Sequence, residues 1–208
     1  MRSKLCITLF LALGVLFLML PAAQADVTMS LVSNPYGQPG PYDVSVNGTN
    51  TWLFCDDFVD HIGIGSTWYA QVISGATGDL STTQMAVRNH WDQATADQAY
   101  SEKAYIELGM TDANRTLYNE AIWYIFNNSL NFGSDQPLIL ALLTQASQNS
   151  AGFYKYVTVY SPTSNIFQGP YQGDTPQEFD SVPDGGMTLI LLGGTLVGVE
   201  TLRRKFRV

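Results

Sequence analysis

Cysteine and histidine are scarce in this sequence of 208 residues. It contains two cysteines, Cys6 and Cys55, and two histidines. Cys6 falls in a segment that we expect to be removed during export, so Cys55 would be alone in the mature protein and no intrachain disulfide could form there. A lone cysteine is more often a buried, inert side chain than a reactive one.

Basic residues are also few outside the two ends of the chain. Between residues 26 and 180 there are four, Arg88, Lys103, Arg115 and Lys155, against sixteen acidic residues, which gives this stretch a net charge of about −12 with histidine neutral. Such a charge repels phosphate backbones and therefore argues against nucleic acid as a partner. We interpret the acidity as a contribution to solubility, with binding of a divalent cation or a cationic polymer as the alternative.

The common catalytic motifs are missing as well. The sequence has no G-x-S-x-G, H-E-x-x-H, C-x-x-C or P-loop pattern. His61 and His90 would be the only imidazole bases of the exported protein. We therefore predict a protein that is not an enzyme and that uses no cofactor.

The amino end has the pattern of a signal peptide. Arg2 and Lys4 precede an apolar run over residues 5–20, and Ala23, Gln24 and Ala25 provide an A-x-A cleavage site. We predict that residues 1–25 are removed before Asp26. The first partners of the chain are then the export machinery and signal peptidase.

The carboxyl end has the pattern of a short membrane anchor. Its parts, in order, are the motif Val182, Pro183, Asp184, Gly185 and Gly186, a predicted transmembrane helix at 187–202, and the basic cluster Arg203, Arg204 and Lys205. The thirteen residues 187–199, which are mostly apolar, span ~20 Å as a helix, against roughly 30 Å of hydrocarbon. The basic cluster fixes this end on the cytoplasmic side.

Residues 182–208 resemble the PEP-CTERM sorting signal in its Val-Pro-Asp form. The resemblance implies that exosortase, a membrane transpeptidase-like enzyme, recognises the tail. The protein would then be anchored in the inner membrane only transiently, before it reaches the cell surface or the extracellular matrix, where exopolysaccharide is the expected partner. A simple tail anchor is the alternative.

Residues 26–160 between these ends predict one globular domain of the α+β class. Strands are predicted at 27–32, 42–46, 51–55 and 67–73 from their alternating apolar residues, and Asn47-Gly48 predicts a tight hairpin turn. About three helices follow, one over residues 100–108 with Lys103 and Glu107 paired on its solvent face, one after Thr111-Asp112 and one after Ser134-Asp135. A final strand is predicted at 153–160, and residues 161–181 are predicted as a linker because they are rich in Pro, Gly and Ser.

The densest polar cluster follows the third predicted strand and comprises Cys55, Asp56, Asp57, Asp60 and His61. Side-chain alternation places Asp56 on the face of Phe54 and Asp57 on the face of Cys55, so the strand must end there or a carboxylate must be buried and paired. The carboxylates could bind Ca²⁺, although their spacing is not that of an EF-hand. Hydrogen bonding within a turn is the other interpretation.

Two further resemblances concern the domain itself. Several motifs resemble a group of PEP-CTERM exported proteins without an assigned activity: Pro41-Tyr42, Cys55-Asp56-Asp57-Phe58, Trp68-Tyr69-Ala70, the predicted helix from Tyr100 to Leu108, Ala121-Ile122-Trp123 and Gln177-Glu178-Phe179. A more distant likeness is to thioester domains of surface adhesins, in which a strand cysteine joins a glutamine ahead of an Ala-Ile-Trp helix. Here Asn119 holds the glutamine position. That resemblance implies covalent capture of an amine.

Three hypotheses of function follow from the sequence. The first is a non-enzymatic component of the cell surface or extracellular polysaccharide matrix. The second is a thioester-type covalent adhesin that acts through Cys55, and the third is a metal-dependent carbohydrate-binding domain that uses the adjacent Asp cluster. Exposed aromatic side chains such as Trp52 could stack on sugar rings.

The two processing predictions are testable together. Protein recovered from the envelope or medium of a host that carries the sorting system should begin at Asp26 and end between Val182 and Gly186. Intact mass spectrometry measures both ends. A chain that retains Val208 and is found only in the membrane would identify a simple tail anchor instead.

Overall fold

The computed structural model describes residues 26–36 and 40–182. The predicted signal peptide (1–25), the sorting residues Pro183, Asp184, Gly185 and Gly186, the transmembrane helix predicted at 187–202 and the basic cluster Arg203, Arg204 and Lys205 lie outside the described residues. Within the described ranges, none of the helices combines the length and the apolar character needed to cross a membrane.

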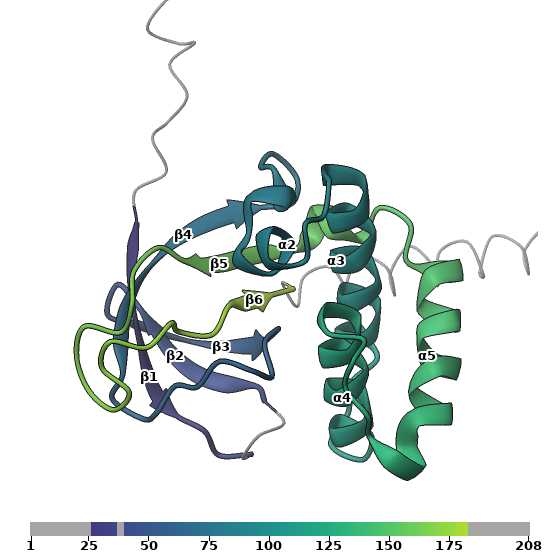
Figure 1. Cartoon of the computed structure of the whole chain (residues 1–208), viewed down its shortest axis with the longest axis horizontal. Helices are drawn as coiled ribbons and strands as arrows, with labels where there is room; N and C mark the ends of the chain where they lie inside the picture. Colours follow the sequence, from purple (N-terminus) through teal and green to yellow (C-terminus); the bar gives the residue numbers. More distant parts are fainter. Residues whose placement is uncertain (1–25, 37–39, 183–208) are drawn as a thin grey trace, which may run out of the picture.

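Six antiparallel strands close into a small barrel (Figure 1). They are β1 (Val27–Ser33), β2 (Tyr42–Val46), β3 (Thr49–Cys55), β4 (Thr67–Ser74), β5 (Thr158–Pro162) and β6 (Phe179–Ser181). Their order around the barrel is β1-β2-β3-β6-β5-β4. The predicted α+β class is therefore confirmed, whereas the closure of the strands into a barrel was not predicted.

The hairpin between β2 and β3 has the turn that the sequence predicts. Asn47 and Gly48 both have positive φ values, 49° and 84°. Two such residues define a type I′ turn, whose twist matches that of the flanking strands. The turn sets the register in which Val46 lies opposite Thr49 and Asp43 lies opposite Trp52.

The helices follow β4 and form a layer beside the barrel (Figure 1). They are α2 (Gln84–Arg88), α3 (Gln93–Leu108), α4 (Arg115–Phe126) and α5 (Gln136–Asn149), with 3-10 turns at Leu80–Thr82, Gly133–Asp135 and Phe153–Tyr156. Helices α3, α4 and α5 pack against one another. The three predicted helices are present, and α2 is an additional short one.

Each layer has its own apolar core. Inside the barrel, the Trp68 and Phe179 rings stack with centroids 5.9 Å apart, and the Tyr42 ring meets Phe179 edge-on at 5.6 Å. The helical layer buries Ile122 and Phe126 together with other apolar side chains. This second core also includes Ile73 of β4 and Val159 of β5, and buried polar groups complete the contact between the two layers, as described below.

The prediction that residues 161–181 form a linker is wrong. Strand β5 extends to Pro162, and β6 joins β3 to β5 and so closes the barrel. Phe179 in β6 is fully buried in the barrel core. The domain therefore extends beyond residue 160, to the end of the described residues. The final strand predicted at 153–160 is in fact a 3-10 turn, Phe153–Tyr156, followed by β5. The segment resembles a linker in composition because only a few of its residues, including Ile166 and Phe179, enter the core.

Truncation of Phe179 distinguishes a core strand from a linker. Because Phe179 is fully buried between Tyr42 and Trp68, Phe179→Ala should lower the free energy of unfolding by about 3–5 kcal/mol. Urea unfolding measures the change. The matched control is Phe167→Ala, since Phe167 is 39% exposed. Equal, small effects of both substitutions would contradict the observed packing.

Candidate functional site

Cys55 ends strand β3 and is 1% exposed. Its thiol donates a hydrogen bond to the carbonyl oxygen of Asp57 (2.9 Å), and its sulfur accepts one from the Asp57 backbone N–H (3.3 Å). Burial, followed by the nearby Asp57 and Asp56 charges, raises the pKa of the Cys55 thiol. The thiol is therefore protonated at neutral pH and is a poor nucleophile.

Asp56 points the other way, toward the helices. Because side chains alternate along β3, Leu53 and Cys55 face the barrel interior, whereas Phe54 and Asp56 face outward. Asp180 of β6 lies opposite Phe54 in the register, so its side chain shares this outward face. Two fully buried carboxyl groups thus project from the barrel onto α3.

Lys103 of α3 receives these carboxyl groups. Its side chain is fully buried, and its Nζ atom contacts Asp180 Oδ1, Glu107 Oε1 and, at 3.2 Å, Asp56 Oδ1. The Lys103–Glu107 pair was predicted, but its place on the solvent face was wrong, because both residues lie against the barrel. We call Lys103, Glu107, Asp56 and Asp180 the Lys103 cluster.

The Lys103 cluster has more carboxyl groups than cations. Burial raises the pKa of Asp56, Glu107 and Asp180, with Lys103 acting in the opposite direction on each. Burial lowers the pKa of Lys103, but the carboxylates, Asp180 foremost, outweigh it and raise that pKa overall. One cation cannot balance three carboxylates in a dry interior, so the cluster holds protons at neutral pH.

One of these protons fits between Glu107 and Asp180. Among the described residues, no N–H or O–H group donates to Glu107 Oε2 or Asp180 Oδ2. The two carboxyl groups do interact side by side, which raises the pKa of Glu107 and lowers that of Asp180. A proton on Glu107 that is hydrogen-bonded to Asp180 satisfies both otherwise unpaired oxygens.

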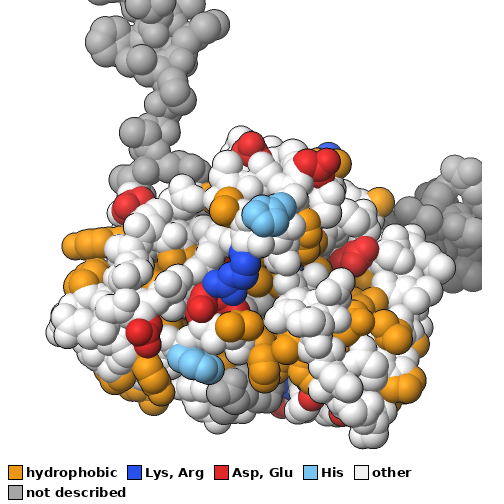
Figure 2. Space-filling view, viewed as in Figure 1, with side chains coloured by type: hydrophobic (Ala, Val, Ile, Leu, Met, Phe, Trp, Pro, Cys, Tyr) orange, Lys and Arg blue, Asp and Glu red, His pale blue; other side chains and the backbone are white. Residues whose placement is uncertain are grey.

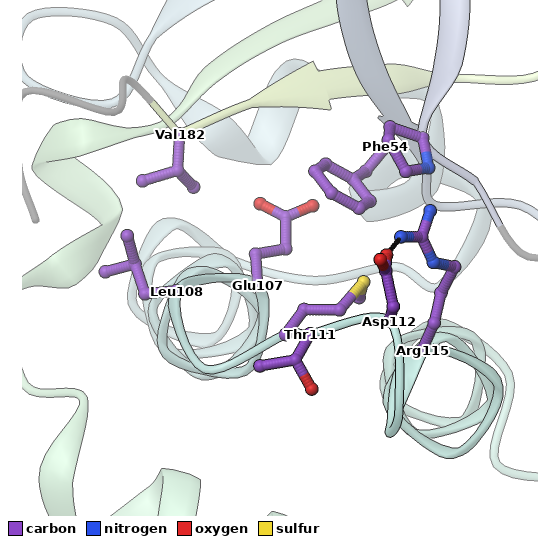
Figure 3. A pocket seen from close by; sticks show the side chains of 9 residues that line it. Phe54, Glu107, Leu108, Thr111, Asp112, Arg115 and Val182 are labelled. Carbon is purple, nitrogen blue, oxygen red and sulfur yellow. Dashed lines mark hydrogen bonds and ion pairs between the residues drawn. The ribbon is translucent and has the colours of Figure 1, made fainter.

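A groove borders the Lys103 cluster (Figure 3). It has a volume of about 440 Å³ and is lined by Phe54, Glu107, Arg115 and Val182, among others. Figure 3 shows the Glu107 carboxyl group directed between the side chains of Phe54 and Val182. Glu107 is therefore the member of the cluster that reaches the groove.

A second buried carboxyl group, Glu178, connects the segment before β6 to the start of α2. Its Oε2 accepts a hydrogen bond from the Gln84 backbone N–H (2.7 Å), and its Oε1 accepts one from the Tyr100 hydroxyl. The Tyr100 hydroxyl oxygen also lies 2.9 Å from Thr83 Oγ1. Burial raises the pKa of Glu178 to about 7, although these hydrogen bonds act in the opposite direction.

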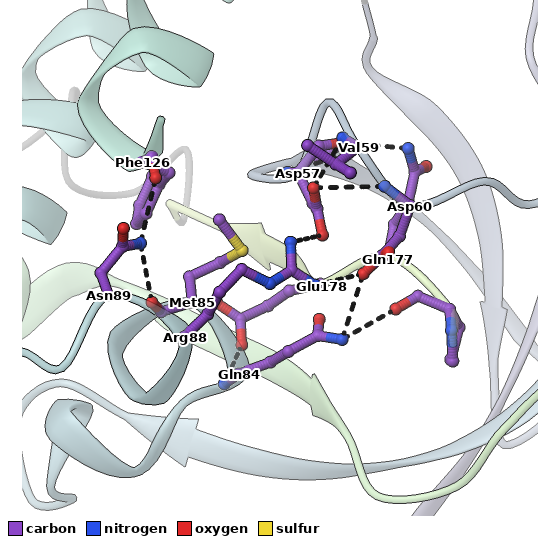
Figure 4. A network of polar contacts seen from close by, with 12 residues as sticks. Asp57, Val59, Asp60, Gln84, Met85, Arg88, Asn89, Phe126, Gln177 and Glu178 are labelled. Atoms are coloured by element: carbon purple, nitrogen blue, oxygen red, sulfur yellow. Dashed lines mark hydrogen bonds and ion pairs between the residues drawn. The ribbon is translucent and has the colours of Figure 1, made fainter. Parts of the chain in front are cut away.

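Asp57 and Asp60 form a separate group with Arg88 (Figure 4). Arg88 donates to Asp57 Oδ2 (2.6 Å) and to Asp60 Oδ2. Asp57 Oδ1 accepts hydrogen bonds from the backbone N–H groups of Val59 (2.8 Å) and Asp60 (3.3 Å). The interpretation that a carboxylate of this segment forms hydrogen bonds within a turn is therefore confirmed for Asp57.

The five candidate residues thus separate into different environments. Cys55 faces the barrel core, Asp56 faces Lys103, Asp57 and Asp60 bind Arg88, and the His61 ring lies 6.3 Å from that of Tyr171. Within residues 26–36 and 40–182, no three His, Cys, Asp or Glu side chains are arranged to hold a metal ion. The hypothesis of a Ca²⁺ site at this segment therefore gains no geometric support.

Helix α4 packs on the end of β3 that carries Cys55. The Trp123 indole N–H donates to the Cys55 carbonyl oxygen at 3.2 Å. Asn119, one turn earlier, is buried and donates to the Arg115 carbonyl oxygen (2.9 Å) and approaches Met110 Sδ (3.6 Å). The Ala-Ile-Trp helix thus lies beside the cysteine strand, while the amide of Asn119 is engaged within the helical layer.

An aromatic pair lies on the outer surface of the barrel. Trp52 and Tyr36 are 53% and 48% exposed, and their ring centroids are 6.4 Å apart. Arg115 stacks on Tyr36, with its Cζ atom 3.8 Å from the ring centroid. We call Tyr36 and Trp52 the aromatic platform.

Sequence reasoning identified Asp56 but missed Lys103, Glu107, Glu178 and Asp180 as parts of a site. The available signal was the alternation of Glu178, Phe179 and Asp180, a strand pattern in a segment that was interpreted as a linker. Recognising it requires knowing which strand lies beside the segment. That information depends on contacts between residues far apart in the sequence.

Comparisons with known proteins give one distant structural similarity. No family model matches the sequence, and no curated protein matches it. Among solved structures, the chain is similar to one described as the N-terminal thioester domain of a surface protein from Clostridium perfringens, with 10% identity and a TM-score of 0.42. The match covers 76% of this chain and 99% of that chain. A likeness at this level carries no argument about function.

The raised pKa of Glu178 predicts that the free energy of unfolding depends on pH. Its pKa is about 7 in the folded protein and near 4.5 in the unfolded chain. Between these pH values the folded state retains a proton that the unfolded state has released, so the free energy of unfolding should fall as pH rises, by about 3 kcal/mol in total from this group. The raised pKa values of Asp56 and Glu107 act in the same direction.

Urea unfolding at a series of pH values from about 4.5 to 7.5 measures the slope of the free energy of unfolding against pH. Glu178→Gln should flatten it, because Gln has no proton to release in this range. The matched control Asp174→Asn changes an exposed carboxylate and should leave the slope as it is. An unchanged slope in Glu178→Gln would show that other groups cause the pH dependence.

Proposed function

We propose that this protein is an exported, non-enzymatic component of the cell surface or extracellular polysaccharide matrix. The support for export is the signal-peptide pattern of residues 1–25 and the PEP-CTERM-like pattern of residues 182–208. We propose that exosortase processes the tail after a transient stay in the inner membrane. The acidic composition between these ends is consistent with a soluble domain outside the cytoplasm.

We further propose that the barrel contacts the exopolysaccharide through the aromatic platform. The observation that carries this proposal is the pair of half-exposed rings on Trp52 and Tyr36, tilted by 52° to each other. The apolar face of a sugar ring packs well on an exposed aromatic ring, while polar groups beside the ring bind the hydroxyls. A platform of this kind binds sugar without catalytic groups.

Polar side chains lie next to Trp52 on the same face of the sheet. Asp43 is directly opposite Trp52 in the β2–β3 register, and Asn50 is two residues before Trp52 on β3. The Asn50 amide donates to Asp43 Oδ2 at 3.3 Å. This arrangement offers a carboxylate and an amide to the hydroxyl groups of a sugar that stacks on Trp52.

Arg115 gives the platform a fixed partner in the helical layer. It forms an ion pair with Asp112, its guanidinium stacks on the Tyr36 ring, and its Nη1 atom donates to the Gly40 carbonyl oxygen at 3.4 Å. Tyr36 is thereby held before a ligand arrives, which lowers the entropy lost on binding.

The charge of the domain favours a neutral polysaccharide over an anionic one. Acidic residues outnumber basic ones by about twelve in residues 26–180. The face shown in Figure 2 has few basic side chains, with acidic and apolar side chains around them. Anionic sugar chains would be repelled by such a surface.

The two alternative functions gain no specific support. Covalent capture through Cys55 requires an accessible, activated sulfur, and Cys55 is buried with a raised pKa. Metal-dependent carbohydrate binding at the Asp cluster requires converging ligands, and Asp56 points away from Asp57 and Asp60 toward Lys103. We therefore retain the non-enzymatic matrix component as the proposed function.

Substitution of the platform tests the carbohydrate contact. Trp52→Ala and Tyr36→Ala should each weaken binding to matrix polysaccharide extracted from the producing cells, by roughly tenfold, because each removes a stacking surface. Depletion assays with the neutral and the acidic polysaccharide fractions measure the affinity, and the neutral fraction should bind more strongly.

The matched control is Tyr156→Ala, since Tyr156 is 47% exposed and belongs to the 3-10 turn before β5. It should bind as the unaltered protein does. Equal losses of binding in all three variants would show that the effect is not specific to the aromatic platform. Unchanged binding in Trp52→Ala and Tyr36→Ala would show that the platform does not contact the polysaccharide.

A further inference from the structure

The Lys103 cluster has a geometry that goes beyond an ion pair. The Nζ atom of Lys103 contacts the Asp180 carboxyl group directly, and both side chains are 0% exposed. Glu107 contacts the same amine and also interacts with the Asp180 carboxyl group. An amine, a carboxyl group and a third group that can carry protons are thus in contact in a dry interior.

We propose that Lys103 Nζ and Asp180 Cγ become joined by an intramolecular isopeptide bond, formed within the folded protein with Glu107 as the proton carrier. The proposal rests on the contacts of the Lys103 cluster and is independent of the aromatic platform. It assigns to this interface a covalent link between helix α3 and strand β6.

The step balances without any co-reactant. Glu107 passes the proton between the two carboxyl groups to an Asp180 oxygen and takes one from the Lys103 ammonium, and the freed nitrogen lone pair attacks Asp180 Cγ to form the C–N bond. The C–O bond to the protonated oxygen then breaks, and its electron pair leaves with the oxygen. Glu107 gives its proton to this oxygen and takes another from the nitrogen, so an amide and one water are formed and Glu107 ends protonated, as it began.

Burial favours this condensation over the persistent ion pair. The reaction replaces a buried ammonium and a buried carboxylate by a neutral amide, which removes the desolvation cost of two charges. Holding the two groups in contact gives effective concentrations on the order of 10⁵ M or more for oriented reactants. The raised pKa of Lys103 makes the neutral amine rare, and the adjacent Glu107 provides the route to it.

Asp180 is the favoured acceptor among the three carboxyl groups. Asp56 is farther from the amine, at 3.2 Å, and no donor among the described residues makes a hydrogen bond to either of its oxygens. The Glu107 side chain is also buried, but it lines the groove of about 440 Å³, so the released water has an exit beside it. The carboxyl group beside the groove therefore suits proton transfer, and the enclosed Asp180 suits the bond.

The bond would secure the weakest strand of the barrel. Strand β6 has only three residues, Phe179–Ser181, and it directly precedes the predicted sorting tail. A pull on the tail would reach β6 first. A covalent link from Asp180 to α3 would pass that force to the helical layer instead of to the few hydrogen bonds of β6.

Mass spectrometry of the full chain, as recovered from its host, tests the proposal. The intact mass should be lower by one water than the mass calculated from its own two ends. Trypsin should fail to cut after Lys103, and peptide 89–115 should be recovered joined to the peptide that begins at residue 156 and contains Asp180. The water loss should persist in hydroxylamine, which cleaves a succinimide but leaves an amide intact.

Substitutions test which side chains form the bond and which one carries the protons. Lys103→Arg and Asp180→Ala should each abolish the joined peptide, Glu107→Ala should strongly reduce it, and the exposed control Asp174→Asn should retain it. Normal cleavage after Lys103 in the unaltered protein would overturn the proposal without reference to any variant. A link from peptide 89–115 to the peptide that contains Asp56 would overturn the choice of Asp180, and a water loss reversed by hydroxylamine would overturn the isopeptide bond.

Discussion

The burial of Lys103 is the constraint on which the rest of the structure depends. Asp56 and Asp180 project from the outer face of the barrel, and Lys103 and Glu107 meet them from α3. Buried charges are stable only when they are mutually satisfied, so the barrel and the helices must adopt one relative position. A shift of α3 by one turn would separate Lys103 from Asp56 and Asp180 and leave these two carboxyl groups without a cation in a dry interface. The Lys103 cluster therefore fixes how the two layers assemble.

Two further polar groups extend this interface. Glu178 bonds to the start of α2 and to Tyr100 of α3, and Arg88 at the end of α2 holds Asp57 and Asp60. Each layer has an apolar core, and the contact between them combines apolar side chains such as Ile73 and Val159 with buried carboxyl groups and their donors. An apolar contact tolerates sliding, whereas directional hydrogen bonds do not. This division leaves the outer face of the barrel, with Trp52 exposed, free for ligand contact.

The site could be predicted from the sequence only in part. The cluster from Cys55 to His61 was visible as a dense polar segment, and the alternation along β3 correctly indicated that Asp56 and Asp57 could not share one environment. Which carboxylate met which cation was not visible, because Arg88, Lys103 and Asp180 are distant in sequence. Lys103 and Glu107 have the spacing of a solvent-exposed helical pair, and spacing alone does not report what covers a helix face.

The sequence by itself determined most local elements: strands β1 to β4, the Asn47-Gly48 hairpin and the main helices, because each depends on side-chain period and turn chemistry within a few residues. It also determined the patterns at the two ends from which export is inferred. Only the tertiary structure decided that residues 179–181 close the barrel and that Lys103 is buried. The physical reason is that a three-residue strand and a buried charge have no stability of their own, and both exist through partners distant in sequence.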